Sequence, residues 1–201
     1  MATRGRWAAR VAASVLLVIA CASAAIAAPG STDRYDNSFR KYSKRFFGPG
    51  FDWRMFKAQA MAESSLDPKA KSGVGARGVM QLLPSTYADV RSSNPGLGAI
   101  DDPDCNIAAG IFQDRQLWNF WTDSSDEQHR DRFTFGSYNA GYVTVKRAQK
   151  LAHDRSLDER LWPSIEAVAP SVPKWRYLET FNYLTRIRTY LALMDANGRV
   201  K

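Results

Sequence analysis

The sequence predicts a single, mainly α-helical domain. Apolar residues recur every three or four positions through most of the chain, and no segment shows the sustained polar and apolar alternation of a half-buried strand. Clusters of Pro, Gly and Ser separate these helical segments. The 201 residues are enough for one hydrophobic core, and the chain has neither repeats nor long low-complexity stretches.

The first 27 residues have the pattern of a secretory signal. Arg4, Arg6 and Arg10 precede a short apolar run at 11–20, and small residues follow as far as Ala27. The run is short and Ala-rich for a membrane span, although an uncleaved anchor is an alternative. Cleavage after Ala27 would leave about 174 residues.

A second processing route is indicated by the four residues that end at Cys21. Val-Ile-Ala-Cys at 18–21 resembles the lipobox of bacterial lipoproteins, in which the Cys is lipid-modified. Both routes predict an exported protein of the periplasm or cell envelope, and the second adds a membrane anchor at Cys21. Under either route Cys105 has no partner for an intrachain disulfide, so we expect a small, semi-buried packing residue.

The formal net charge is +8, and the chain stays basic without its first 27 residues. A basic surface suits nucleic acid, an anionic membrane or an anionic wall polymer. Export favours the wall or the membrane, and no block of Arg and Lys marks a nucleic-acid arm. We therefore expect no nucleic-acid partner.

The rest of the chain is expected to be organised as a tether, a domain and a tail. Residues 28–50 form a basic tether that leads into a first helix, whose aromatic side chains pack on the domain at 51–196. Residues 197–201 form the tail, because Asn197-Gly198 closes the last helical pattern. The expected helices cover 51–64, a short stretch from 84, 107–120, 142–152 and 174–196.

Glu63 is the acidic side chain around which the chemistry is predicted. It ends a buried helix, and the Gly-rich loop at 67–78 can fold closely over it. Partial burial would favour the protonated carboxyl, which is the form a general acid needs. Ser72, Met80 and Gln81 would come near it. The alternative is a solvated helix end with no catalytic role.

The sequence at 63–86 is E-S-S-L-D-P-x-A-x-S-x-x-G-A-x-G-x-M-Q-L-x-P-x-T, and it resembles the soluble-lytic-transglycosylase family. The resemblance implies that Glu63 is the catalytic acid and base and that Ser72 hydrogen-bonds it. It also implies that Met80 and Gln81 line the sugar cleft. The expected fold is then a lysozyme-like catalytic domain of the goose type.

Two later segments resemble further motifs of the same family. Residues 133–141, F-T-F-G-S-Y-N-A-G, are similar to its A-Y-N-A-G motif, which implies that the Tyr138 hydroxyl points toward the acid and that Asn139 shapes the cleft. Residues 177–183 resemble its closing P-x-E-T-x-x-Y, although a Tyr stands in place of the Pro. This implies a substrate contact from Glu179. Without the family, the first motif is only a helix end.

No metal and no cofactor are expected. The three Asp of the loop at 94–104 lack the ligand spacing of an EF-hand, so we expect them to charge or cap the N-terminus of the next helix. Asn106 is expected to cap that helix, and 102–110 match the family pattern D-P-x-x-N-I-x-x-G. His129 and His153 have no convincing set of further ligands.

The resemblance implies a lyase that acts on peptidoglycan. Glycosidases of the lysozyme type usually need two carboxylates. One suffices if the 2-acetamido group of N-acetylmuramic acid stabilises the sugar cation and its C6 hydroxyl replaces water. Glu63 would then form 1,6-anhydromuramic acid ends. The alternatives are a hydrolytic muramidase, with Asp67 or Glu179 as second carboxylate, and a non-catalytic peptidoglycan-binding module.

Overall fold

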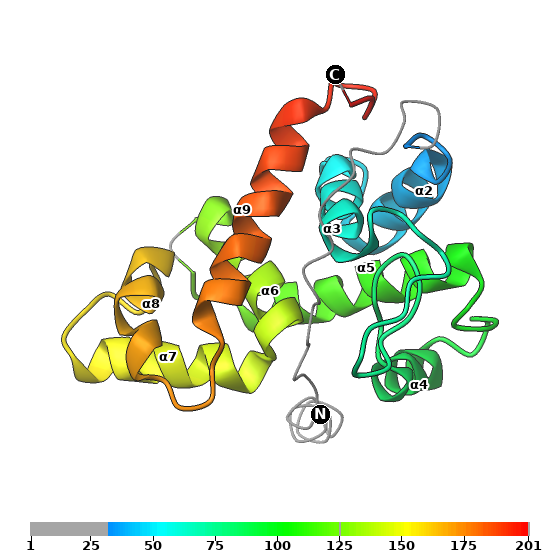
Figure 1. Ribbon diagram of the computed structural model, residues 1–201. Coiled ribbons are helices and arrows are strands. Elements are labelled where there is room, and N and C mark those ends of the chain that lie inside the picture. The colour runs from blue at the N-terminus through cyan, green and yellow to red at the C-terminus, as the bar shows by residue number, and fades with distance from the viewer. Residues whose placement is uncertain (1–31, 125, 201) are drawn as a thin grey trace. The chain divides into compact units, whose positions relative to one another are not determined.

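The structure, a computed structural model, describes residues 32–124 and 126–200. Its regular elements in these ranges are helices, α2 to α9 and one short 3₁₀ helix, with isolated β-bridges between loops (Figure 1). The prediction of a mainly α fold is therefore confirmed. The expected signal sequence, including Cys21, lies outside the described residues. None of the described helices combines the length and apolarity needed to cross a membrane.

The described chain divides into two compact units. The Glu63 unit consists of residues 32–115 and 185–200, and the Tyr138 unit consists of residues 116–184. The boundary falls within α5 and α9. In chain order the helices are α2 (Asp36–Phe47), α3 (Arg54–Ser64), α4 (Pro84–Ser93), α5 (Pro103–Phe120), α6 (Glu127–Ala140), α7 (Tyr142–Asp154), α8 (Trp162–Val168), η2 (Ala169–Ser171) and α9 (Tyr177–Leu193).

Local hydrogen bonds explain where two of these helices begin. Helix α3 begins at Arg54, whose backbone N–H donates to Asp52 Oδ1 at 3.0 Å. Helix α5 begins at Pro103, earlier than expected, because Asp102 Oδ1 accepts the N–H of Cys105 at 2.8 Å. Such side-chain acceptors satisfy amides that have no partner within the helix. The expectation that an Asp of this loop caps the helix is confirmed for Asp102.

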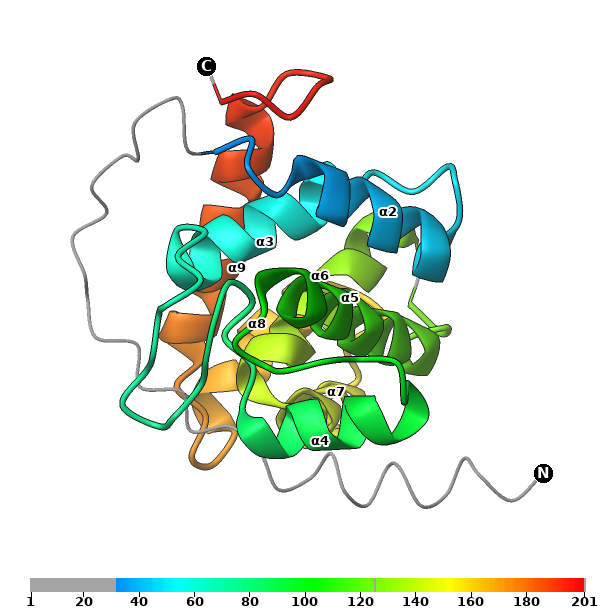
Figure 2. The ribbon, with the colours of Figure 1, turned by 90° about the vertical axis from the view of Figure 1, so that its right-hand side faces the viewer.

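Helix α2 lies beside α3 in the Glu63 unit (Figure 2). Its aromatic side chains Phe39 and Tyr42, with Tyr35 just before the helix, are buried. Ser38 and Tyr42 both donate hydrogen bonds to the carboxylate of Asp104, at the start of α5. The expectation that the aromatic residues before the domain pack on it is therefore confirmed, and α2 is an integral part of this unit.

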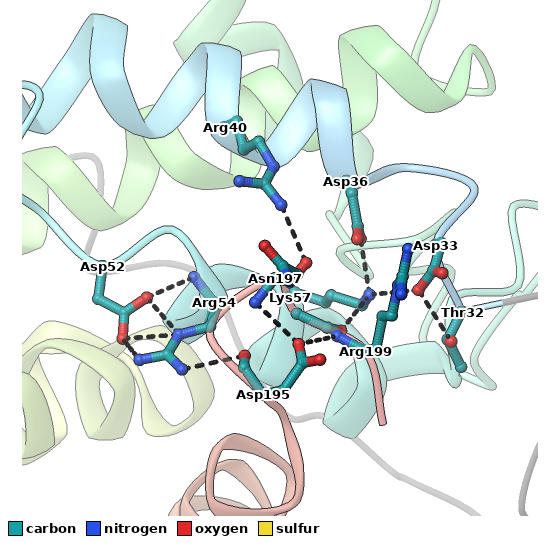
Figure 3. Close-up of polar contacts among 11 residues, drawn as sticks. Thr32, Asp33, Asp36, Arg40, Asp52, Arg54, Lys57, Asp195, Asn197 and Arg199 are labelled. Atoms are coloured by element: carbon teal, nitrogen blue, oxygen red, sulfur yellow. Dashed lines mark hydrogen bonds and ion pairs between the residues drawn. The ribbon is translucent and has the colours of Figure 1, made fainter. Parts of the chain in front are cut away.

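A fully buried lysine connects α3 to the start of α2, with the residues just before it, and to the C-terminal segment (Figure 3). The Lys57 ammonium lies 2.6 Å from Asp36 Oδ1 and 3.4 Å from Asp33 Oδ1, and it donates to the Gly198 carbonyl at 2.8 Å. A buried ammonium needs such partners, since desolvation penalises an unpaired charge heavily. Lys57 therefore fixes three separate chain segments together.

The C-terminal segment folds back as a closed turn. Helix α9 ends at Leu193, before the expected Ala196, and Met194 pairs with Val200 as a β-bridge. Asp195 Oδ1 accepts the N–H of Arg199 at 2.9 Å within this turn. At Gly198 φ is +84°, and a Cβ there would collide with the Trp53 ring. The segment expected as a tail is thus packed on the start of α3.

The substitution Lys57→Met is expected to lower the free energy of unfolding by about 3 kcal/mol at pH 7. It leaves the nearly buried Asp36 carboxylate without its cation, and removing one partner of a buried pair is strongly destabilising. Lys150→Met is the matched control, because the ion pair of Lys150 with Asp154 is exposed and should change stability by less than about 0.5 kcal/mol. Urea unfolding measures both, and equal effects would contradict this role.

The Tyr138 unit is built around α6, which packs on α7 and α8. Gly136 allows a close approach, since a Cβ there would lie 2.5 Å from Trp162 Cη2. The Trp162 ring also meets the edge of Phe133, with centroids 5.2 Å apart. Trp121 Nε1 donates to the Ser137 hydroxyl at 3.0 Å. These contacts fix the helix that carries Tyr138 and Asn139.

Candidate active site

Glu63 lies where the sequence predicts it, one residue before the end of α3. The preceding turns of the helix are buried from Phe56 to Ala62, whereas Glu63 itself is half-buried. The helix ends because Ser65 adopts a left-handed conformation, with φ of 55°, and its N–H returns to the Met61 carbonyl. The carboxyl therefore stands at the boundary between a buried helix and the loop that follows.

The Gly-rich loop folds back on the end of α3. The Ser64 hydroxyl donates to the Val79 carbonyl at 2.8 Å and joins the helix to the far side of the loop. Ser72 closes a smaller turn, since its hydroxyl accepts the N–H of Ala76 at 3.0 Å and its own N–H donates to the Ala76 carbonyl. Ser72 is half-buried within this turn. The loop is therefore joined to the end of the helix that carries Glu63, and its closure over Glu63 itself stays a prediction.

Met80 is fully buried against α5. A Cβ at Gly110 would lie 2.8 Å from Met80 Cβ, so the absent side chain at Gly110 makes room for this contact. The N–H of Met80 donates to Asn106 Oδ1 at 2.8 Å. Met80 thus anchors the end of the loop on the helix beneath it.

Asn106 does not cap α5, and that expectation was wrong. It lies inside the helix, nearly fully buried, because Asp102 already supplies the cap. Its Nδ2 donates at 3.0 Å to the carbonyls of both Arg77 and Ile100, while its Oδ1 accepts from Met80. One amide side chain therefore holds two loops and α5 together.

Gln81 has its amide nitrogen committed to the loop. Its Nε2 donates to the carbonyls of Ala70 at 3.1 Å and Gly78 at 3.0 Å, and its backbone has φ of 45°. The remaining polar atom, Oε1, is an acceptor. A contact of Gln81 with a sugar would therefore be made to a hydroxyl or amide N–H of the substrate.

The Tyr138 unit brings the other two motifs together. Tyr138 and Asn139 lie in the last turns of α6, both buried, and Gly141 ends the helix with φ of 83°. Asn139 Oδ1 accepts from the Thr180 hydroxyl at 2.9 Å, and Trp175 Nε1 donates to the same hydroxyl at 3.0 Å. The segment at 177–183 is thus joined to the Tyr-Asn-Ala-Gly motif.

The other candidate carboxylates each have a hydrogen-bond or ion-pair partner. Glu179, in the first turn of α9, forms an ion pair with Arg176, with Nε and Oε2 3.0 Å apart. The exposed Asp67 accepts the N–H of Lys69 at 2.8 Å, as expected for a residue that caps a Pro turn. In the loop before α5, Asp101 pairs with Arg77 at 3.3 Å.

A buried polar pair that was not predicted from the sequence lies one turn before Glu63. Gln59 Nε2 donates to Asp114 Oδ1 at 3.2 Å, and both side chains have an exposed fraction of 0%. The available signal was spacing, because Asp114 follows Ile107 and Ile111 on the buried face of α5. A charged residue type at such a position requires a partner or a proton.

The helical fold and the arrangement around Glu63 define a lysozyme-like protein of the transglycosylase class. The family model "Transglycosylase SLT domain" matches residues 39–161. This chain belongs to that family.

Curated relatives and solved structures agree with this membership. The chain is 34% identical over 150 residues to membrane-bound lytic murein transglycosylase F of Shewanella sediminis (strain HAW-EB3), covering 74% of this chain and 30% of the relative. The corresponding protein of Desulfosudis oleivorans (strain DSM 6200 / JCM 39069 / Hxd3) is 32% identical over 164 residues, covering 75% and 35%. The chain therefore spans about a third of the length of these relatives.

The fold is similar to that of the 70 kDa soluble lytic transglycosylase from Escherichia coli. The TM-score is 0.57 with 25% sequence identity, over 83% of this chain and 26% of that one. The lytic transglycosylase Slt from Pseudomonas aeruginosa has the same fold, with a TM-score of 0.53 and 20% identity, over 84% of this chain and 27% of that one. The predicted lysozyme-like, SLT-type fold is confirmed.

Proposed function

We propose that this protein is a peptidoglycan lytic transglycosylase that cleaves the β-1,4 bond between N-acetylmuramic acid and N-acetylglucosamine without water. The observation that carries the proposal is the position of Glu63, which is half-buried at the end of α3 with the family's loop folded back on that helix. The relatives in the comparison are named lytic murein transglycosylases, which supports the same substrate. The basic charge of the chain suits an anionic wall polymer.

Glu63 acts twice in this reaction. As a neutral acid it gives its proton to the glycosidic oxygen, so the N-acetylglucosamine leaves with a hydroxyl. The 2-acetamido carbonyl of the muramic residue stabilises the cation that remains at C1. The Glu63 carboxylate then takes the proton of the C6 hydroxyl while that oxygen bonds to C1, which closes the 1,6-anhydro ring and restores the acid. No atom is added to the glycan.

The other site residues position this acid and the sugars. Ser72, Met80 and Gln81 belong to the loop that follows the acid. We assign the fully buried Met80 to holding this loop on α5, and Ser72 and Gln81 to contacting the substrate. Tyr138 and Asn139 are assigned to substrate positioning from the Tyr138 unit. Glu179 is assigned a weaker substrate contact, because its carboxylate is already paired with Arg176.

The test is the mass of the muropeptides that the purified protein releases from purified sacculi. Cleavage without water adds no atoms to the glycan, whereas hydrolysis adds one water. A fragment with an anhydromuramic end is therefore about 18 Da lighter than the same fragment with a reducing end. We expect anhydromuramic ends. Reducing muramic ends would favour a hydrolytic muramidase, and binding to sacculi without cleavage would favour a non-catalytic binding module.

We place the protein in the cell envelope, and we further propose that a lipid is attached at Cys21. The export pattern at 1–27 and the name "membrane-bound" of the relatives support an envelope location. In cells fed a labelled fatty acid, the wild-type protein should take up the label, and Cys21→Ser should not. An unlabelled wild-type protein whose mature chain begins at Ala28 would contradict the lipoprotein route.

A further inference from the structure

The Gln59–Asp114 pair lies beneath Glu63 in the Glu63 unit. Gln59 and Glu63 are four residues apart on α3, so they occupy the same face of the helix. Asp114 comes from α5 and meets Gln59 at 3.2 Å, with both side chains fully buried. The turn of α3 that precedes the proposed acid is therefore joined to α5 by a buried hydrogen bond.

The pair leaves two buried oxygens without a hydrogen-bond partner among the described residues. They are Asp114 Oδ2 and Gln59 Oε1, and both are acceptors when Asp114 is ionised. A buried carboxylate with a single neutral donor is costly. If Asp114 carries a proton on Oδ2, this oxygen becomes a donor. Gln59 Oε1, on the amide that already donates to Asp114, is an acceptor available to it. An acid and an amide can then exchange two hydrogen bonds.

The environment of Asp114 also favours the protonated, neutral carboxyl. Burial raises the pKa of the Asp114 carboxyl well above its ordinary range, the hydrogen bond from Gln59 lowers it, and the nearby charge of Glu63 raises it further. The Lys57 ammonium on α3 is paired with Asp36, and the adjacent Arg115 guanidinium lies over the Phe47 ring at 5.2 Å. Neither cation neutralises Asp114.

We propose that Asp114 is a positioning residue, held as a neutral carboxylic acid by Gln59, which supports the turn of Glu63 and leaves Glu63 as the carboxyl that ionises during the reaction. This inference rests on the proposed role of Glu63. Two-carboxylate hydrolysis needs a second, ionised carboxylate. A neutral Asp114 can neither take a proton from water nor stabilise a sugar cation with its charge.

The support of Glu63 is tested by two substitutions at Asp114. Asp114→Leu removes the partner of Gln59, and we expect kcat on sacculi to fall about tenfold with KM unchanged. Asp114→Asn reproduces the donor and acceptor of the neutral acid, and it should restore kcat to within about threefold of the wild type. If Asn is as poor as Leu, the ionisable group itself is required and the proposal fails. If Leu is as active as Asp, the pair does not position Glu63.

The protonation state is measured directly by NMR on the full chain with ¹³C-labelled Asp carboxyl groups. The signal absent in Asp114→Asn identifies Asp114. We expect the chemical shift of a neutral acid at pH 7, and the shift of a carboxylate would overturn the proposal. This result does not depend on turnover. It is therefore distinct from a failure of the proposed function, which would appear as activity retained in Glu63→Gln.

Discussion

Glu63→Gln is expected to lower turnover on sacculi by roughly 10²–10⁴-fold, the usual contribution of general acid–base catalysis. The amide keeps the shape of the side chain but can neither give a proton to the glycosidic oxygen nor accept one from the C6 hydroxyl. Because Glu63 is half-buried at a helix end, the change should leave the fold and binding to sacculi intact. Release of soluble muropeptides measures turnover, and sedimentation with sacculi measures binding.

Asp67→Asn is the matched control for that experiment. Asp67 is the next acidic residue along the chain, it is exposed, and its carboxylate caps a turn by accepting from Lys69. We expect this variant to keep turnover within about threefold, since an amide oxygen accepts the same hydrogen bond. More than about a tenth of wild-type turnover in Glu63→Gln would remove Glu63 as the acid. A large loss in Asp67→Asn would make Asp67 a second catalytic carboxylate.

Asn106→Asp is expected to have the second largest effect, on stability and on turnover together. The carboxylate can still accept from Met80, but it loses both donors and places a negative charge against the carbonyls of Arg77 and Ile100. Because buried groups are left without hydrogen-bond partners, the free energy of unfolding should fall by about 3 kcal/mol. Displacement of the loop beside Glu63 should lower turnover by about 10²-fold, since small misplacements are costly in catalysis.

Asn94→Asp makes the same change at a half-exposed site in the same unit. Its Nδ2 donates to the Val90 carbonyl at 3.0 Å at the end of α4, away from the loop contacts of Asn106. We expect the free energy of unfolding to fall by less than about 1 kcal/mol and turnover to stay unchanged. Thermal unfolding and muropeptide release check both variants. Equal behaviour of the two would show that Asn106 does not organise the loop.

The helical fold and the position of Glu63 were predictable because both depend on local patterns. Residues 51–64 contain no Gly or Pro, which predicts a helix, and the glycines that follow predict a loop. The structure has the helix end and the loop at these residues. The aromatic residues Phe39 and Tyr42 likewise indicated a face that packs on the domain. Periodicity and turn chemistry were sufficient in these cases.

Contacts between distant segments were not predictable in the same way. Asn106 matched a motif, but its sequence neighbours favoured a capping role, and only the approach of the loops at Arg77 and Ile100 gives its amide three partners. Gln59 and Asp114 lie 55 residues apart, and neither resembles a catalytic residue in its own segment. The contact of Lys57 was not predictable either, because its partner, the Gly198 carbonyl, lies 141 residues further along the chain.

Digestion of sacculi in water enriched in ¹⁸O tests the central claim most directly. If the C6 hydroxyl of the muramic residue attacks C1, the new ends contain no solvent oxygen, and the released muropeptides have the same mass in heavy and in ordinary water. A positioned intramolecular hydroxyl outcompetes water because effective concentrations of such groups reach roughly 10⁵ M or more. We predict anhydromuramic ends without ¹⁸O. Reducing muramic ends that carry one ¹⁸O, in digests free of other wall enzymes, would contradict the account.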